Sequence, residues 1–415
     1  MLKLDKKKRT NKCVCFLLKG YKDLPLHKNI VSVMKKLNLL ASAIVIMAVA
    51  SCGVDIDNKE PRHRGEKDIK ITSIKCDTVY MDGSSLSLEG SWIMKEDTLV
   101  WFDKYTHGAH LFSMDGNYIT RLIEKGDGPN DMKTYPWAVC ADGNDGIIIL
   151  DANNMLHHYD KMWQKRNKAF YIQRGNKMSE AEWEDLYNNP NPENPYMYEY
   201  NFNVGRLAMV DDSTLIIPAI TEHVKFNGYS PSMGSVEYWQ KAYNFMGVNI
   251  CSSSPNTLFG HFPAVYREKN MPVFASYDLA VKDENIYVAY AADSFIYVMD
   301  KTGHVSKMIG YASALGDTNY PVTLSFDEAE ENMGAHLKKY GRYMNVYAYG
   351  DYIFRTYVKE DKTGYGLQVY KGDDMVGDIP MDTPMRIVGY KDDVFYAFLS
   401  PDKEKDLFRM VKFRL

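Results

Sequence analysis

The chain has 415 residues, with 50 Lys and Arg, 54 Asp and Glu, and a formal net charge of −4. Residues 1–51 hold 11 of the basic and 2 of the acidic residues, so residues 52–415 carry a net charge of −13. Nucleic-acid binding depends on clustered Lys and Arg that neutralise phosphates. An acidic chain without a basic stripe therefore argues against a nucleic-acid partner.

The N-terminal region has the pattern of a bacterial lipoprotein signal. Lys35 and Lys36 follow Met34, an apolar stretch runs from Leu37 to Ala50, and small residues precede Cys52. The apolar stretch is shorter than the roughly 20 residues that span a bilayer, which disfavours a transmembrane helix. We predict that residues 1–51 are a signal region with Met34 as the true start; an extended basic region that begins at Met1 is the alternative.

This signal predicts where the protein is located. The thiol of Cys52 is the expected lipidation site, which would carry palmitate or a similar acyl chain, and residues 52–67 form a charged tether. We expect the membrane partner to be reached through this N-terminal anchor, in the cell envelope at the outer membrane. The sequence leaves open whether the protein faces the periplasm or the cell surface.

The remaining cysteines do not form a disulfide framework. Cys76, Cys140 and Cys251 are scattered, and each lies in or beside an apolar stretch. We expect them to be small buried side chains.

A repeated unit dominates residues 68–415, in which an Asp, Asn or Gly turn precedes a short apolar or aromatic strand. The strands of the six units are 98–102, 147–150, 213–217, 286–290, 352–357 and 394–398. Several units continue through a second turn into further strands. Repetition of strand, turn and strand around a ring is typical of a β-propeller. We predict an all-β fold, a six-bladed β-propeller over 68–415.

Two further features complete the predicted ring. Polar or helix-like insertions at 179–195, 231–243 and 325–340 account for the longest gaps between the units. Strand-like segments lie at both ends of the chain, at 69–81 and 408–413. We predict that the N-terminal strand completes the last blade beside the C-terminal strands, which closes the ring.

The signal, the first blade and the segment from Ile123 to Asn130 together resemble the TolB-like six-bladed propeller lipoproteins. In that family the first blade typically ends in a Gly-x-Gly-Pro turn, which here is Gly126-Asp127-Gly128-Pro129. The acidic residue that usually follows is displaced to Asp131. The resemblance implies an envelope-anchored propeller, and it supplies no catalytic residues because the family has no agreed activity.

Motifs that carry chemistry are scarce. The sequence has no HExxH, no GxSxG, no P-loop and no complete calcium loop. His107 with His110, and the pair His157 and His158, lack a third ligand nearby in sequence. We therefore predict no metal site and no cofactor.

Aromatic residues offer the clearest indication of binding. The chain has 31 Tyr residues, and the insertions contain five aromatic residues that could line a rim for a sugar or a peptide. These are Tyr196, Tyr198, Tyr200, Tyr238 and Trp239. The alternative is that their rings pack the insertions onto the blades.

Two classes of function remain open. We favour a monomeric, non-enzymatic binding or scaffold module of the envelope that holds a glycan, a peptide or a protein partner. The alternative is an envelope hydrolase or lyase with its site in the propeller channel. Its acid and base would come from residues such as Asp103, Asp151, His261 and Arg267.

Overall fold

The computed structural model describes residues 65–415 except 84, 144–145, 167–168, 173–178, 222, 230–234, 253 and 324. The predicted signal region (1–51), Cys52 and most of the tether (52–67) lie outside the described residues. Pro61–Leu415 form one compact unit. No described helix is long and apolar enough to cross a membrane.

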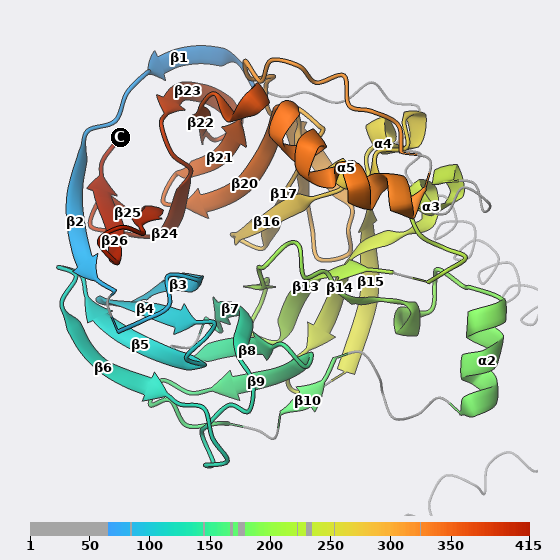
Figure 1. Cartoon of the computed structure of the whole chain (residues 1–415), viewed down its shortest axis with the longest axis horizontal. Coiled ribbons are helices and arrows are strands. Elements are labelled where there is room, and N and C mark those ends of the chain that lie inside the picture. The colour runs from blue at the N-terminus through green and yellow to red at the C-terminus, as the bar shows by residue number, and fades with distance from the viewer. Residues whose placement is uncertain are drawn as a thin grey trace, which may run out of the picture. The chain divides into compact units, whose positions relative to one another are not determined.

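Six small sheets follow one another around a ring, as Figure 1 shows. In the first blade the order is β3 (Gly90–Lys95), β4 (Thr98–Asp103), β5 (Gly108–Ser113) and β6 (Tyr118–Ile123). The second has β7 (Pro136–Ala141), β8 (Ile147–Asp151), β9 (Met155–Tyr159) and β10 (Phe170–Tyr171). The fourth has β16 (Tyr277–Lys282), β17 (Asn285–Tyr290), β18 (Ile296–Met299) and β19 (Val305–Ile309).

The other three blades depart from this plan. In the third, β11 (Glu199–Tyr200) and β12 (Ala208–Met209) both pair with β13 (Thr214–Ile220), followed by β14 (Tyr243–Asn249) and β15 (Ser254–His261). The fifth has β20 (Arg342–Tyr349), β21 (Tyr352–Val358), β22 (Tyr365–Lys371), β23 (Asp374–Met381) and β1 (Lys67–Ile71). The sixth has β24 (Met385–Lys391), β25 (Val394–Asp402), β26 (Leu407–Phe413) and β2 (Cys76–Asp82).

The six predicted turn-plus-strand units are the second strands of the six blades: β4, β8, β13, β17, β21 and β25. Several of the preceding turns require a positive φ, which Asp and Gly tolerate. At the turn before β25, for example, Asp392 has φ 50° and Asp393 has φ 61°. The six-bladed propeller predicted from the sequence is therefore confirmed.

Both ends of the chain close the ring. β2 pairs antiparallel with β26 in full register, from Cys76 opposite Phe413 to Asp82 opposite Leu407. This confirms the predicted closure. The N-terminal segment 69–81 is not one strand, however, because β1 pairs parallel with β23 in the fifth blade before β2 joins the sixth.

The helices lie in connections that leave one face of the ring. α2 (Glu180–Asn188) follows β10, α3 (Ser235–Lys241) follows β13, α4 (Ala264–Glu268) follows β15, and α5 (Phe326–Lys339) follows β19. Antiparallel strands alternate in direction, so the second and fourth strands of every blade end on the same face. We call this the insertion face. Three short 3₁₀ segments complete the described helices: Pro195–Met197, Pro272–Phe274 and Glu360–Lys362.

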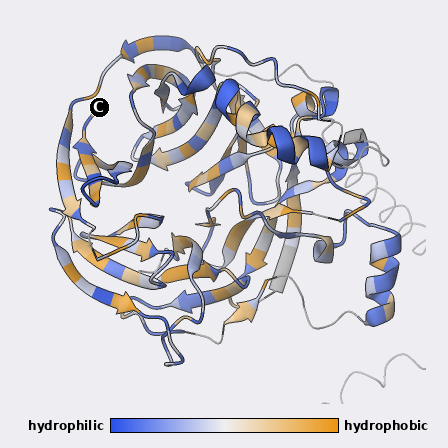
Figure 2. Ribbon diagram, in the orientation of Figure 1, coloured by the Kyte–Doolittle hydropathy of each residue, from blue (hydrophilic) through white to orange (hydrophobic). Residues whose placement is uncertain are grey.

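Local sequence explains the insertion helices. Ser179 caps α2 through a capping box with Glu182, and Ser325 accepts a bond from the amide of Glu328 at the start of α5. Figure 2 shows that α2 and α5 are largely hydrophilic, whereas the blade strands alternate between apolar and polar residues. α2 and α5 therefore expose most of their residues to solvent, and each contributes one buried side chain, Leu186 and Ala329.

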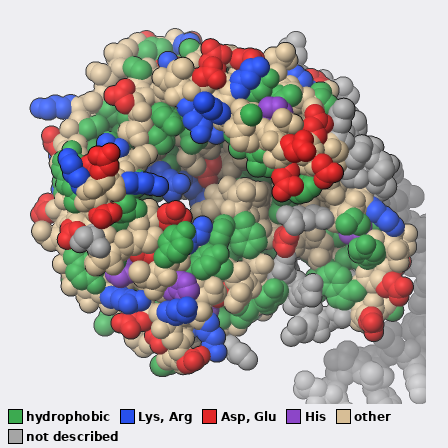
Figure 3. All heavy atoms as spheres, viewed as in Figure 1, with side chains coloured by type: hydrophobic (Ala, Val, Ile, Leu, Met, Phe, Trp, Pro, Cys, Tyr) green, Lys and Arg blue, Asp and Glu red, His purple; other side chains and the backbone are tan. Residues whose placement is uncertain are grey.

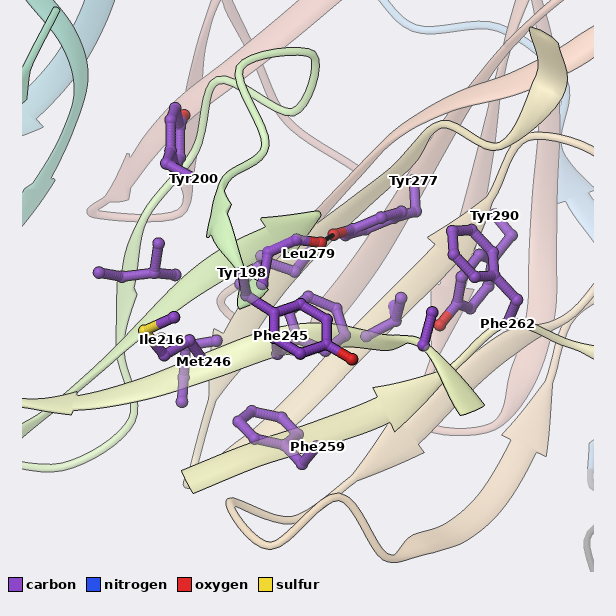
Figure 4. Packing of buried hydrophobic residues seen from close by; sticks show 14 of the residues in the cluster. Tyr198, Tyr200, Ile216, Phe245, Met246, Phe259, Phe262, Tyr277, Leu279 and Tyr290 are labelled. Carbon is purple, nitrogen blue, oxygen red and sulfur yellow. Dashed lines mark hydrogen bonds between the residues drawn. The ribbon is translucent and has the colours of Figure 1, made fainter. Parts of the chain in front are cut away.

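The largest core cluster spans the second, third and fourth blades and the insertions around them. Figure 4 shows part of it, with Phe245 and Phe259 from neighbouring strands of the third blade. Tyr277 joins the fourth blade to the third, because its hydroxyl donates to the carbonyls of Ala219 (3.0 Å) and Asn244 (2.6 Å). Tyrosine thus supplies both apolar area and hydrogen bonds between blades.

The cysteines differ in exposure. Cys140 is buried, Cys76 is half-buried, and Cys251 is exposed. The expectation of a buried side chain is wrong for Cys251, because this residue lies in the turn that follows β14 rather than in a strand.

Candidate ligand-binding channel

A cavity of about 1630 Å³ runs through the centre of the ring. Its wall comes from the innermost strands β3, β7, β16, β20 and β24 and from residues 202–209 of the third blade. Figure 3 shows the opening, with Lys and Arg side chains at its edge. The channel is the site in which a propeller can surround a small ligand or the end of a larger one.

The third blade contributes an irregular segment to this wall. Tyr200 of β11 lies opposite Ala219, and Ala208 of β12 lies opposite Ile216, so both short strands belong to one broken innermost strand. Residues 201–207 bulge out between them. Every residue from Phe202 to Leu207 lines the channel. We call this segment the channel bulge.

Arg206 fastens the channel bulge to two other blades. Its Nη1 donates to the carbonyls of Leu279 (3.2 Å) on β16 and Val346 (2.9 Å) on β20. Its Nε lies 3.3 Å from Oδ1 of Asp278, and its guanidinium carbon lies 4.7 Å from the ring centroid of Tyr347. One side chain thus connects the third, fourth and fifth blades across the channel.

Asp278 is the buried partner of this arginine. Its Oδ2 accepts hydrogen bonds from the amide of Val346 (3.0 Å) and from Nδ2 of Asn345 (3.2 Å). Burial raises the pKa of Asp278 above its usual range, even though Arg206 and these hydrogen bonds oppose the shift. The carboxylate is therefore used in joining blades and has little freedom to act on a ligand.

The fifth and sixth blades supply further cations to the wall. Arg342 and Arg386 both line the channel, from β20 and β24. Arg342 donates to the carbonyl of Leu337 (2.5 Å) at the end of α5, whereas Arg386 is exposed. Lys391 pairs with Asp97 of the first blade.

An aromatic group lies where the first, second and third blades meet. Trp137 packs edge-on against Phe202 with centroids 4.9 Å apart, and its Nε1 donates to the carbonyl of Phe202 (3.3 Å). Nζ of Lys104 lies 3.8 Å from the centroid of the Trp137 ring, within the range of a cation–π contact. These contacts hold the base of the channel bulge in place.

The aromatic residues predicted to form a rim are mostly in the core. Tyr198, Tyr200, Tyr238 and Trp239 are buried, and Tyr196 packs half-buried against the same cluster. Figure 4 shows Tyr198 and Tyr200 among the core residues. Their rings are not presented to solvent as a rim, because the insertions need large apolar side chains to pack onto the blades. This placement favours the packing interpretation.

The residues considered for a hydrolase are also not on the channel wall. Asp103 accepts hydrogen bonds from the amides of Tyr105 and Thr106, and Asp151 accepts one from His157 at 2.8 Å, each within its own blade. His261 contacts the carbonyl of Ala242, and Arg267 lies in α4. None of the four lines the channel.

Histidines proposed and rejected as metal ligands have structural partners instead. His157 binds Asp151, and His158 binds Asp142, each at 2.8 Å. Among the described residues, no group of three or more His, Cys, Asp or Glu side chains could hold a metal ion.

Sequence reasoning missed Arg206, Asp278 and Arg386. A signal existed for Asp278, which interrupts the apolar strand from Tyr277 to Val281, because a charge in such a strand requires a buried partner. Nothing in the sequence indicates that this partner is Arg206, which lies 72 positions earlier in the chain.

Comparisons with known proteins support the fold and no more. No family model matches the sequence, and no curated protein matches it significantly. A member of the DUF4221 family from Bacteroides vulgatus superposes with a TM-score of 0.59 at 10% identity, over 82% of this chain and 98% of that one. An exported protein from Bacteroides fragilis gives 0.47 at 12% identity (84% and 98% covered). BamB from Moraxella catarrhalis gives 0.32 at 9% (85% and 84% covered). The chain is thus similar in fold to the DUF4221 family member, and the TolB-like resemblance stays a prediction.

Proposed function

We propose that the chain is an envelope-anchored lipoprotein that acts as a non-enzymatic binding or scaffold module, with its ligand held in the central channel. The observation that carries this proposal is the channel wall, where the channel bulge and five innermost strands surround one cavity. Its lining combines 17 aliphatic side chains (Ala, Val, Ile, Leu and Met) with 11 aromatic rings and five Lys or Arg side chains. Such a lining supplies contact area and orientation to a bound glycan, peptide or protein segment.

The chemistry of the wall favours binding over catalysis. General acid–base catalysis needs a titratable group within reach of the substrate. The carboxylate of Asp278 is buried beneath Arg206 and bonded to the backbone of β20. A hydrolase or lyase in the channel is the alternative, and the carboxylates that line the channel for it are Glu89, Glu96 and Asp97 of the first blade.

The attachment of the N-terminus is compatible with a lipid anchor at Cys52. β1 begins at Lys67 and pairs with β23, as the outermost strand of the fifth blade. A tether that reaches the ring at its circumference leaves the channel free for a ligand. The proposed glycan, peptide or protein partner would then enter without displacing the anchor.

Ligand retention tests the binding proposal. Asn203 is an exposed residue of the channel bulge, and Asn117 is an exposed residue of the β5–β6 turn, outside the channel wall. Tagged protein would be purified gently from its own cells and weighed by native mass spectrometry. We expect bound ligand on the wild type and on Asn117→Trp, and its loss from Asn203→Trp. Equal retention by both variants would contradict the channel as the binding site.

Anchoring is tested separately. We expect an alkyne analogue of palmitate to label the wild type and not Cys52→Ser, and the variant to leave the membrane fraction. Protease treatment of intact cells, with a periplasmic control protein, then distinguishes the two faces of the membrane. Labelling of Cys52→Ser at the wild-type level would contradict the anchor.

A further inference from the structure

The charges of the channel wall are not evenly distributed. All three acidic residues that line it belong to the first blade: Glu89, Glu96 and Asp97. The lining residues of the fifth and sixth blades include no acid and three cations, Arg342, Arg386 and Lys391. The cationic side of the channel thus lies within a chain whose residues 52–415 carry a net charge of −13.

Most cations of the wall are already occupied. Arg206 lies against Asp278, and Lys391 pairs with Asp97. Lys104 covers the face of Trp137, and Arg342 donates to the carbonyl of Leu337. Within the described part of the chain, Lys104 and Arg386 alone among these cations have neither an ion pair nor a hydrogen-bond acceptor for their side chains, and of these two only Lys104 lies over an aromatic ring.

The surroundings of Arg386 form a defined wall. The hydroxyl of Tyr347 reaches the carbonyl of Met385, the residue before Arg386, at 3.4 Å. The ring of Tyr347 also contacts the guanidinium of Arg206. Tyr349 continues the same strand along the channel. Arg386 therefore lies on a strand, β24, that Tyr347 joins to β20, and β20 is in turn held by Arg206.

We propose that Arg386 binds a carboxylate group of the ligand in the channel, whose wall Tyr349 of β20 also lines. A guanidinium presents two parallel N–H donors that match the two oxygens of a carboxylate. Arg206 is balanced by Asp278 and Lys391 by Asp97, whereas Arg386 has no carboxylate partner. The single negative charge of a carboxylate would supply one. The inference rests on the proposed function, since it names the chemistry of a ligand in the same channel.

The test uses three small probes of similar shape and different charge. Benzoate carries the carboxylate, benzamide is its neutral counterpart, and phenyl phosphate carries a second negative charge. Binding to the full chain would be measured by calorimetry or by ligand-observed NMR. The variants are Arg386→Gln and Arg386→Lys, with Arg414→Gln as control, because Arg414 is an exposed arginine outside the channel wall.

We expect benzoate to bind the wild type and Arg414→Gln equally, and Arg386→Gln at least tenfold more weakly. Arg386→Lys keeps the charge and loses the paired donors, so its affinity should be intermediate. Thermal melting should be unchanged in all three variants, because the Arg386 side chain makes no internal hydrogen bond.

Three results would overturn the inference. Equal affinity for benzoate and benzamide would mean that the channel binds rings without using the charge, which leaves the proposed function in place. Tighter binding of phenyl phosphate than of benzoate would exclude a carboxylate preference. Absence of benzoate binding to the wild type would reject the carboxylate site. The proposed function would then still be tested separately, by comparing ligand retention in the wild type, Asn117→Trp and Asn203→Trp.

Discussion

The innermost strands of the ring are of two kinds. In five blades they are continuous: β3, β7 and β16 have six residues each, β20 has eight and β24 has seven. In the third blade, β11 and β12 have two residues each, and the channel bulge separates them. The continuous strands build the ring, and the broken strand shapes the space inside it.

This difference has a physical basis. An innermost strand pairs with the next strand of its blade on one side only, so its other edge faces the channel. A seven-residue interruption there costs few sheet hydrogen bonds. Arg206 replaces some of them with bonds to the backbones of β16 and β20. Irregular structure is thus tolerated at the channel and is the place where a binding function can differ between propellers.

Removal of β26 should have the largest effect, because it breaks the regular part of the ring. The strand pairs with β25 on one side and with β2 on the other. We expect a chain truncated after Asp406 to lose cooperative melting in calorimetry. A cooperative transition near that of the full chain would contradict ring closure by both termini.

Arg355→Met should have the next largest effect, again within a regular blade. Arg355 is fully buried, and its guanidinium donates to Gln368 Oε1 and to the carbonyls of Ser294 and Tyr311. Because the variant leaves these buried acceptors without their donor, we expect the free energy of unfolding to fall by at least about 3 kcal/mol. Urea denaturation measures it, with Arg414→Gln as the surface control. A loss as small as that of the control would contradict this role.

Arg206→Met changes the channel bulge and should have a smaller effect. We expect the free energy of unfolding to fall by about 1–3 kcal/mol at pH 7. The loss should depend on pH. Burial raises the pKa of Asp278 in the folded state, and removal of Arg206 raises it further. When the pKa of a carboxyl group is higher in the folded state than in the unfolded state, the group destabilises the fold. This destabilisation grows as pH rises from the unfolded-state pKa through the folded-state pKa. The deficit of the variant should therefore shrink as pH falls toward 4, and a constant deficit would contradict the pairing.

Lys301→Gln should have the smallest effect. Nζ of Lys301 in the fourth blade lies 2.9 Å from Asp211 in the third, in an exposed pair. Burial alone would raise the pKa of Asp211. Hydrogen bonds from Lys301, Ser213 and Thr214 outweigh this effect and lower the pKa. A carboxyl group whose pKa is lowered by folding stabilises the protein at pH values above its unfolded-state pKa. This stabilisation is lost as pH falls through the folded-state pKa. We expect a difference near the detection limit of urea denaturation at pH 7 that shrinks as pH falls below about 4.

The regular part of the molecule was predictable from the sequence. Second strands such as β8 and β17 are apolar because neighbouring blades cover them, and the turns before them use residues that accept positive φ. Local pattern is therefore enough to count the blades. The closure followed from strand-like segments at both ends of the chain.

The channel was not predictable in the same way. Residues 201–207 have no strand periodicity, and the contacts of Arg206 join positions 72 and 140 residues apart. The tyrosines of the insertions did not separate a binding rim from a core. A cluster of aromatic residues is typical of both, and the structure buries Tyr198 and Tyr200. A single sequence does not separate these two uses of an aromatic ring.

Photo-crosslinking in the cells that make this protein tests the central claim, that the channel holds the ligand. A benzophenone amino acid would replace Tyr349 on the channel wall or, as the matched control, Tyr118 on the outermost strand β6. We predict a discrete adduct from position 349 and none from position 118. Adducts from position 118 alone would place the binding surface on the outside of the ring and contradict the account.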